Sequence, residues 1–219
     1  MVIEKGTFIE LDYTGRLEDG TVFDTTKESV AKEAGLNPKA TYKPTIICVG
    51  EGHLLKGLDE FLVGKEPGTY TVELEPEQAF GKKDAKLLKL VPLKKFTENK
   101  IKPFVGLEVN IDGSYGVVRS LSGGRVTVDF NHPLASRNLK YDLHVHRVVH
   151  STQEQVAAIL DVIGLHHHGV SVDGDTAVVK VHAELPEPVI DRLTKVVARL
   201  TKAKRLRCEI DRDGHAKKH

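Results

Sequence analysis

Residues 11–24 constrain the fold more than any other part of the chain. Their sequence, LDYTGRLEDGTVFD, predicts a strand carrying Tyr13, a turn at 18–20, and a returning strand carrying Phe23 and Asp24. Because the strands of a hairpin lie side by side, two aromatic rings and one carboxylate are expected in one small concave site.

The composition is that of an ordinary globular protein. With 219 residues, of which 40% are hydrophobic and 29% charged, the chain can bury a sizeable core in one or two domains. The 32 Lys and Arg balance 31 Asp and Glu, so nothing favours nucleic acid or an anionic membrane as a partner. The N-terminal residues have no apolar stretch typical of a secretory signal, so we expect none. No run approaches about 20 apolar residues, and Cys48 and Cys208 lack metal-type spacing. We expect a cytoplasmic protein.

Alternation of apolar and polar residues predicts strands at 7–13, 70–74 and 139–149. A short helix is expected near 58–62. The residues expected to face inward on the last strand are Leu139, Tyr141, Leu143 and Val145. Together these elements predict an α+β fold in which an antiparallel curved sheet surrounds one short helix.

Two segments do not fit that compact unit. Residues 25–43 form a long polar excursion with a possible helical turn. Residues from about 84 to 129 carry their own strands at 106–111 and 124–129, with turns at 112–113 and 122–124. A self-contained β unit inside a loop predicts an inserted domain.

After His150 the apolar period changes from two to that of a helix. A capping-box pattern at 151–155 opens one helix, a strand follows at 175–182, a second helix spans 186–204, and a last strand lies at 206–210. The apolar stripe of the second helix comprises Val189, Ile190, Leu193, Val196, Val197 and Leu200. This is a small α+β domain whose stripe predicts self-association, as a homodimer.

Two further motifs, VGEGHLLKGLD at 49–59 and PEQAFG at 76–81, follow residues 11–24. The three motifs in this order resemble the FKBP family of peptidyl-prolyl cis-trans isomerases. The interruption before NHPLA at 131–135 resembles the SlyD-like branch with its insert-in-flap domain, and the excursion and C-terminal domain resemble long archaeal members.

The resemblance implies a division of the chain into three parts. Residues 1–84 and 130–150 would form the prolyl isomerase domain, and 85–129 a chaperone insert that grips unfolded or nascent polypeptides. Residues 151–219 would form an association domain.

By position, the resemblance also implies the prolyl site. Its residues are Tyr13, Phe23, Asp24, Leu54, Leu55, Leu58, Phe80 and Tyr141. An X-Pro bond isomerises across a barrier of about 18–20 kcal/mol, and an apolar, aromatic-walled cleft favours the twisted amide, so no cofactor or metal is needed. The Leu55 N–H would hold a substrate carbonyl, and Asp24 would orient the twisted carbonyl or Tyr13. Phe80 replaces a frequent Tyr and Leu58 a frequent Trp; activity is expected to survive, whereas tight macrolide binding is not.

Other functions remain open. The site could be vestigial in a non-enzymatic holdase. The run 166–168 of three histidines could make the chain a metal-handling factor, although no cysteines accompany it and surface histidines are the favoured interpretation. Residues 192–218 carry ten Lys and Arg against three acids, but without interleaved aromatics a solvated helix face is favoured over RNA binding.

Overall fold

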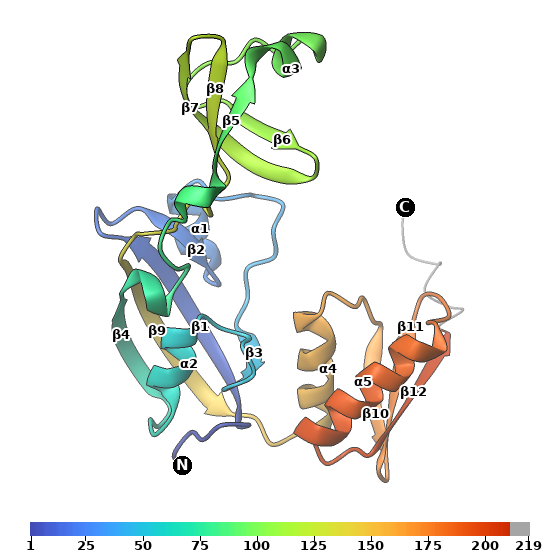
Figure 1. Cartoon of the computed structure of the whole chain (residues 1–219). Coiled ribbons are helices and arrows are strands. Elements are labelled where there is room, and N and C mark those ends of the chain that lie inside the picture. The colour runs from blue at the N-terminus through green and yellow to red at the C-terminus, as the bar shows by residue number, and fades with distance from the viewer. Residues whose placement is uncertain (211–219) are drawn as a thin grey trace. The chain divides into compact units, whose positions relative to one another are not determined.

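The computed structural model describes residues 1–210, which form two compact units (Figure 1). One unit comprises Met1–Glu73 and the described residues from Leu139 onward, and the other comprises Leu74–Asn138. The last residues of the predicted C-terminal domain and of the basic segment 192–218 lie outside the described part.

The first unit is built on a five-stranded sheet. Its strands are β1 (Phe8–Leu17), β2 (Val22–Thr25), β3 (Thr45–Cys48), β4 (Gly68–Leu74) and β9 (Leu139–Val148). The order is β2-β1-β9-β4, and β3 pairs with the first half of β1. β1 runs antiparallel to β2, β3 and β9. The predicted α+β class is therefore confirmed.

The alternation of apolar and polar residues along the strands decides which face of this sheet is buried. The four residues predicted to face inward on β9 are all buried, between 1% and 4% exposed. Ile9 and Leu11 of β1 are completely buried, and so is Leu62 of the helix α2 (Lys56–Leu62). The short predicted helix therefore exists, and its apolar residues belong to the core.

The polar excursion contains one short helix, α1 (Glu28–Glu33). Of this helix only Ala31 is buried, while its charged residues are exposed and Lys32 pairs with Glu28 across one turn. The sequence prediction of a helical turn in this segment was correct.

The C-terminal part is a three-stranded sheet with two helices. In chain order its elements are α4 (Thr152–Val162), β10 (Gly169–Asp173), β11 (Thr176–Val181), α5 (Glu187–Leu200) and β12 (Arg205–Ile210). Ser151 caps α4 by accepting a hydrogen bond from the Glu154 N–H, as the capping-box pattern predicts. β11 and β12 are parallel and joined through α5, and β10, which was not predicted, lies antiparallel to β11.

Most of the apolar stripe of α5 is covered within its own unit. Leu193 and Val197 are buried, and Ile190, Val196 and Leu200 pack against the same core. Val189 remains 40% exposed. The reason for expecting a homodimer was an uncovered stripe; most of that stripe is covered, and the homodimer stays a prediction.

The unit Leu74–Asn138 has its own sheet and core. Its elements are two 3₁₀ turns (Pro76–Gln78 and Ala85–Leu87), β5 (Leu88–Pro92), α3 (Leu93–Glu98), β6 (Glu108–Ile111), β7 (Ser114–Ser122) and β8 (Arg125–Asp129). The strand order is β5-β8-β7-β6, and the core is formed by Val91, Phe96, Val109, Val118, Val126 and Val128. β5, α3 and β7 were not predicted from the sequence, and Leu88 and Leu90 of β5 are exposed.

No helix within residues 1–210 is both long and apolar enough to span a bilayer.

Candidate functional site

Three neighbouring strands bring the predicted aromatic residues together. Gly15 of β1 lies opposite Asp24 on β2 and Tyr141 on β9. The Phe23 ring meets the Tyr141 ring edge-on, with centroids 5.8 Å apart, and the Tyr13 ring lies 6.1 Å from Tyr141. These four predicted residues, Tyr13, Phe23, Asp24 and Tyr141, form what we call the aromatic cluster.

Gly15 is required beneath this cluster. A Cβ atom at position 15 would stand 2.6 Å from Phe23 Cζ and 3.0 Å from Tyr141 Cε1, closer than carbon atoms approach. The missing side chain lets both rings lie directly on the backbone of β1. Sequence reasoning did not single out Gly15, although it is part of the YTG motif that pointed to the site.

A hydrogen bond fixes the polar edge of the cluster. The Tyr13 hydroxyl donates to Asp24 Oδ2 over 3.1 Å, and Asp24 is exposed. Burial raises the pKa of the Tyr13 and Tyr141 phenols, and the Asp24 carboxylate raises both further. Both phenols are therefore neutral at physiological pH, and the cluster presents two aromatic walls with one carboxylate at its rim.

A tight turn leads into α2 and carries Leu54 and Leu55. Leu55 is the N-cap residue of α2, and its carbonyl accepts hydrogen bonds from the N–H groups of Leu58 and Asp59. We find no acceptor for the Leu55 N–H among residues 1–210. Both leucines are half-buried. A half-buried leucine with an unused N–H fits the role of a backbone donor to a substrate carbonyl.

Two of the predicted site residues, Leu58 and Phe80, are not part of the aromatic cluster. Leu58 is only 1% exposed and is a core residue of the first unit, so its role as the floor of an open pocket stays a prediction. Phe80 belongs to the unit Leu74–Asn138, where its ring stacks on His132 at 4.2 Å. Its membership of the site also stays a prediction.

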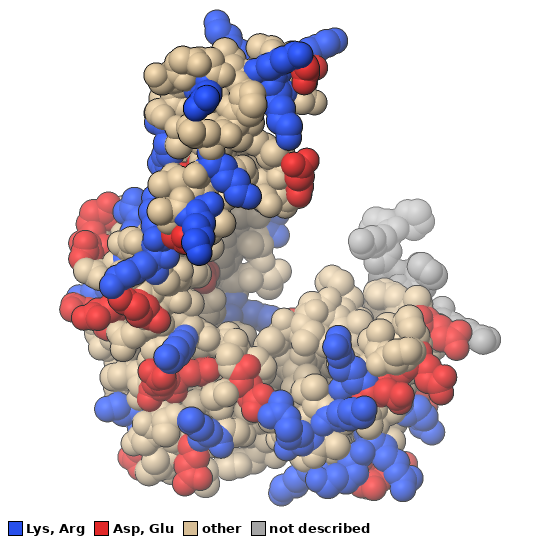
Figure 2. Space-filling model, in the orientation of Figure 1, with Lys and Arg blue, Asp and Glu red and all other residues tan. Residues whose placement is uncertain are grey.

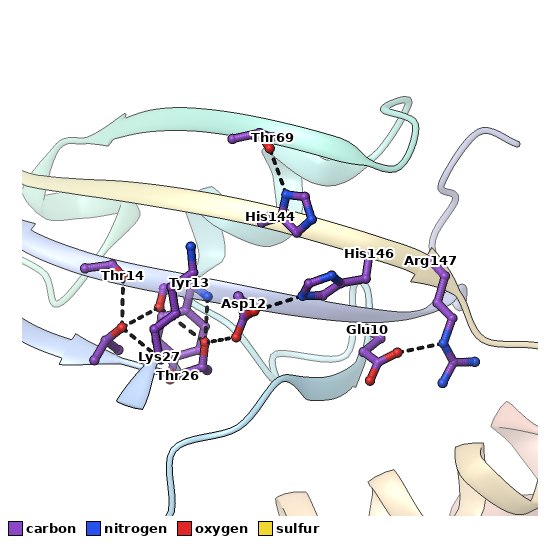
Figure 3. Close-up of polar contacts among 11 residues, drawn as sticks. Glu10, Asp12, Tyr13, Thr14, Thr26, Lys27, Thr69, His144, His146 and Arg147 are labelled. Atoms are coloured by element: carbon purple, nitrogen blue, oxygen red, sulfur yellow. Dashed lines mark hydrogen bonds and ion pairs between the residues drawn. The ribbon is translucent and has the colours of Figure 1, made fainter. Parts of the chain in front are cut away.

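A polar network, not anticipated from the sequence, ties Thr26, directly after β2, and His146 of β9 to Asp12 of β1 (Figure 3). Thr26 Oγ1 donates to Asp12 Oδ1 over 2.6 Å, and His146 Nε2 lies 2.9 Å from Asp12 Oδ2. Burial alone would raise the pKa of Asp12, but these hydrogen bonds outweigh it and lower the pKa. Asp12 is therefore held as a carboxylate that anchors the start of the excursion directly after Asp24. Thr25 and Thr26 in the sequence were its only signal.

One residue of the histidine run 166–168 lies against another histidine. His168 Nε2 lies 2.8 Å from His182 Nδ1. Among residues 1–210 no three His, Cys, Asp or Glu side chains gather into a group able to hold a metal ion.

Comparison with known proteins shows the family of this chain. A family model described as "FKBP-type peptidyl-prolyl cis-trans isomerase" matches residues 2–96. A short-type peptidyl-prolyl cis-trans isomerase of Methanocaldococcus jannaschii is 34% identical over 149 residues, which cover 67% of this chain and 94% of that protein. The chain belongs to the FKBP-type peptidyl-prolyl cis-trans isomerases.

Other members of this family are also similar. A 16 kDa FKBP-type isomerase of Escherichia coli is 30% identical over 149 residues, covering 65% of this chain and 91% of that protein. A SlyD of Vibrio cholerae is 30% identical over 162 residues, covering 72% of this chain and 74% of that protein. A model described as "FKBP26, IF domain" matches residues 89–134. The resemblance to FKBP proteins with SlyD-like relatives is confirmed.

Proposed function

We propose that this FKBP-type isomerase acts at the aromatic cluster, with Leu54 and Leu55 holding the substrate backbone. The observation that carries the proposal is the edge-on packing of Phe23 on Tyr141 above Gly15, with the Tyr13–Asp24 hydrogen bond at its rim. Leu58 and Phe80 complete the proposed site by family position.

The mechanism needs no covalent chemistry. The planar X-Pro amide is stabilised by charge separation, which water solvates well and an aromatic wall solvates poorly. Placing the amide between Phe23 and Tyr141 therefore raises the free energy of the planar form relative to the twisted one. The Leu55 N–H supplies a fixed hydrogen bond to the substrate backbone, so that binding energy is used to position the amide.

The test is isomerisation of a short X-Pro peptide by the full chain. Phe23→Ala, Asp24→Ala and Tyr141→Ala are each expected to lower kcat/KM. Phe61→Ala is the matched control, because Phe61 packs edge-on against Tyr70 at 5.7 Å in a second aromatic pair. Full activity in all three site variants, with native circular dichroism, would contradict the site assignment. No activity in the unmodified protein would favour a non-enzymatic holdase.

We further propose that the insert, residues 85–129, binds unfolded segments as a chaperone. Its exposed apolar residues include Leu88, Leu90, Ile101, Phe104, Val105, Tyr115 and Leu121, of which Tyr115 is 77% exposed. Figure 2 shows uncharged surface framed by Lys and Arg side chains on this unit. Apolar surface of this extent on so small a unit is typical of an interaction site.

A groove in the same unit offers a place for a client side chain. It has a volume of about 360 Å³. Apolar residues of β5 and β6 and the Phe130 ring line it, together with the charged side chains of Lys89, Lys95 and Asp112. Polypeptides containing X-Pro bonds are the proposed partners. Tethering them here raises the local concentration of prolines near the active domain.

Point variants test the chaperone proposal without cutting the chain. Leu90→Ser combined with Phe104→Ser removes apolar surface at residues that are 61% and 59% exposed. Peptide isomerisation should be unchanged, whereas suppression of aggregation and catalysis of proline-limited refolding should fall. Val63→Ser combined with Val189→Ser is the matched control, since both valines are exposed outside the insert. Equal refolding activity in the two double variants would refute the proposal.

A cytoplasmic location belongs to the same proposal, supported by Cys48 and Cys208, which are both unpaired. A homodimer through 151–219 stays a prediction of the same proposal, supported only by the exposed Val189, because the rest of the α5 stripe packs within its own unit.

A further inference from the structure

The turn that carries Leu54 and Leu55 is held from α2 by one buried carboxylate. Asp59, which is 8% exposed, accepts hydrogen bonds from the Gly50 and Gly52 N–H groups, each over 3.1 Å. Both glycines have positive φ, 85° and 71°, which lets the backbone fold back over Asp59. The backbone on both sides of Glu51 is therefore fixed from within the isomerase domain.

The tip of the same turn is held from the C-terminal domain. Glu51, between the two glycines, receives two hydrogen bonds from Arg199 near the end of α5, each 2.6 Å long. This is the parallel fork geometry in which Arg binds a carboxylate most strongly. Hydrogen bonding from Arg199 lowers the pKa of Glu51 against a smaller opposing effect of burial. The pair is therefore ionised at physiological pH.

Apolar packing supports the same junction. Cys48, completely buried at the start of the turn, and Phe8 of β1 belong to one hydrophobic core with Val197 of α5. The Cys48 N–H donates to His53 Nδ1 over 3.1 Å, closing the turn on itself. Because Val197 lies only two residues before Arg199, packing of α5 on this core fixes where the guanidinium is presented.

We propose that Arg199 is a positioning residue for the prolyl site, acting through Glu51 to hold the turn that presents Leu54 and Leu55. The C-terminal domain is then a support for the substrate-binding loop. This inference rests on the proposed roles of Leu54 and Leu55. Asp59 restrains the turn from one side and Arg199 from the other, and both restraints end within three residues of Leu54.

Loss of this restraint should appear in KM. Without Arg199 the turn samples arrangements in which the Leu55 N–H is misplaced, and the apparent affinity falls with the fraction of binding-competent turn. The aromatic cluster lies on β1, β2 and β9 and is not contacted by Arg199. The aromatic rings that favour the twisted amide therefore stay in place, and kcat should change little. A partly exposed, bidentate ion pair supports an effect of about threefold to fivefold.

The experiment measures kcat and KM separately for X-Pro peptide isomerisation by full-length variants. Arg199→Ala and Glu51→Gln should each raise KM about threefold to fivefold with little change in kcat. The charge swap Glu51→Arg with Arg199→Glu should recover part of the loss, which a merely structural role for either side chain would not produce. Arg207→Ala is the matched control, because Arg207 pairs with Glu209 on its own strand β12.

Unchanged KM in Arg199→Ala and Glu51→Gln, with Phe23→Ala inactive in the same assay, would overturn the inference and leave the site assignment intact. Full activity of Phe23→Ala would instead overturn the site assignment, and the inference with it. If Arg199→Ala proves unstable, Arg199→Lys keeps the charge and loses the fork. An unchanged KM in that variant and in Glu51→Gln likewise refutes the inference.

Discussion

Replacing Gly15 with alanine tests whether the two aromatic walls must lie on a bare backbone. The added Cβ would stand 2.6 Å from Phe23 Cζ, 2.9 Å from Phe23 Cε2 and 3.0 Å from Tyr141 Cε1. Carbon atoms in contact rest about 3.5–4.0 Å apart, so the nearest ring edge must retreat by roughly 1 Å. Tyr141 is only 4% exposed and cannot yield, whereas Phe23 is half-buried. The Phe23 ring is therefore the one expected to move.

The cost divides between stability and catalysis. Overpacking of this kind costs about 1–3 kcal/mol, while alanine lowers the entropy of the unfolded chain and returns about 0.4–1 kcal/mol. The net loss in free energy of unfolding should thus be about 0–2.5 kcal/mol, and the protein stays folded. A displacement of about 1 Å in a catalytic wall can lower the rate by up to about a hundredfold, and we expect at least a tenfold loss in kcat/KM.

The assay is isomerisation of a short X-Pro peptide, together with unfolding in denaturant. Two glycines provide matched controls. Gly68→Ala, in β4, meets no atom closer than 3.6 Å and should be fully active and no less stable. Gly116→Ala, in β7, would place its Cβ 2.7 Å from Val128 Cγ1 and should disturb only the insert. If Gly15→Ala is folded and as active as Gly68→Ala, the argument that the rings require this glycine is wrong.

Three further outcomes are expected. Hydrogen bonds from Lys83 and Asn131 outweigh the effect of burial and hold the pKa of Asp129 well below its ordinary value. This stabilisation is present above the unfolded pKa of about 3.9 and is lost as the pH falls below it, so Asp129→Asn should flatten the acid limb of the unfolding free energy measured between about pH 5 and 2. Tyr141→Phe should keep most peptide isomerase activity, unlike Tyr141→Ala, because the wall acts through its ring; a loss equal to that of the alanine variant would point to the hydroxyl. Burial, followed by the charge of Glu51, raises the pKa of Cys48 to about 12. A thiol reagent at pH 8 should therefore label Cys48 only after unfolding, and fast labelling of the native protein would contradict its buried position.

Local patterns predicted the sheet and the short helix because each depends on a period visible in a few residues. The alternation at 139–149 predicted which four side chains of β9 are buried, and all four are. The capping pattern at 151–155 likewise predicted the start of α4. Several elements were missed: the nine-residue strand β7 and the shorter β5, α3 and β10, of which β5 and β10 each bury only one residue.

By itself, the sequence determined the family of this protein and the identity of its aromatic cluster, because those residues stand at fixed spacings within short motifs. Only the tertiary structure decided which distant residues support them. The pairing of β1 with β2 and β9 places Gly15 under Phe23 and Tyr141, and the packing of α5 brings Arg199 to Glu51, 148 residues away in the chain. The same packing covered most of the α5 stripe that had predicted a dimer. Such contacts depend on long-range packing, for which a single sequence carries no periodic signal.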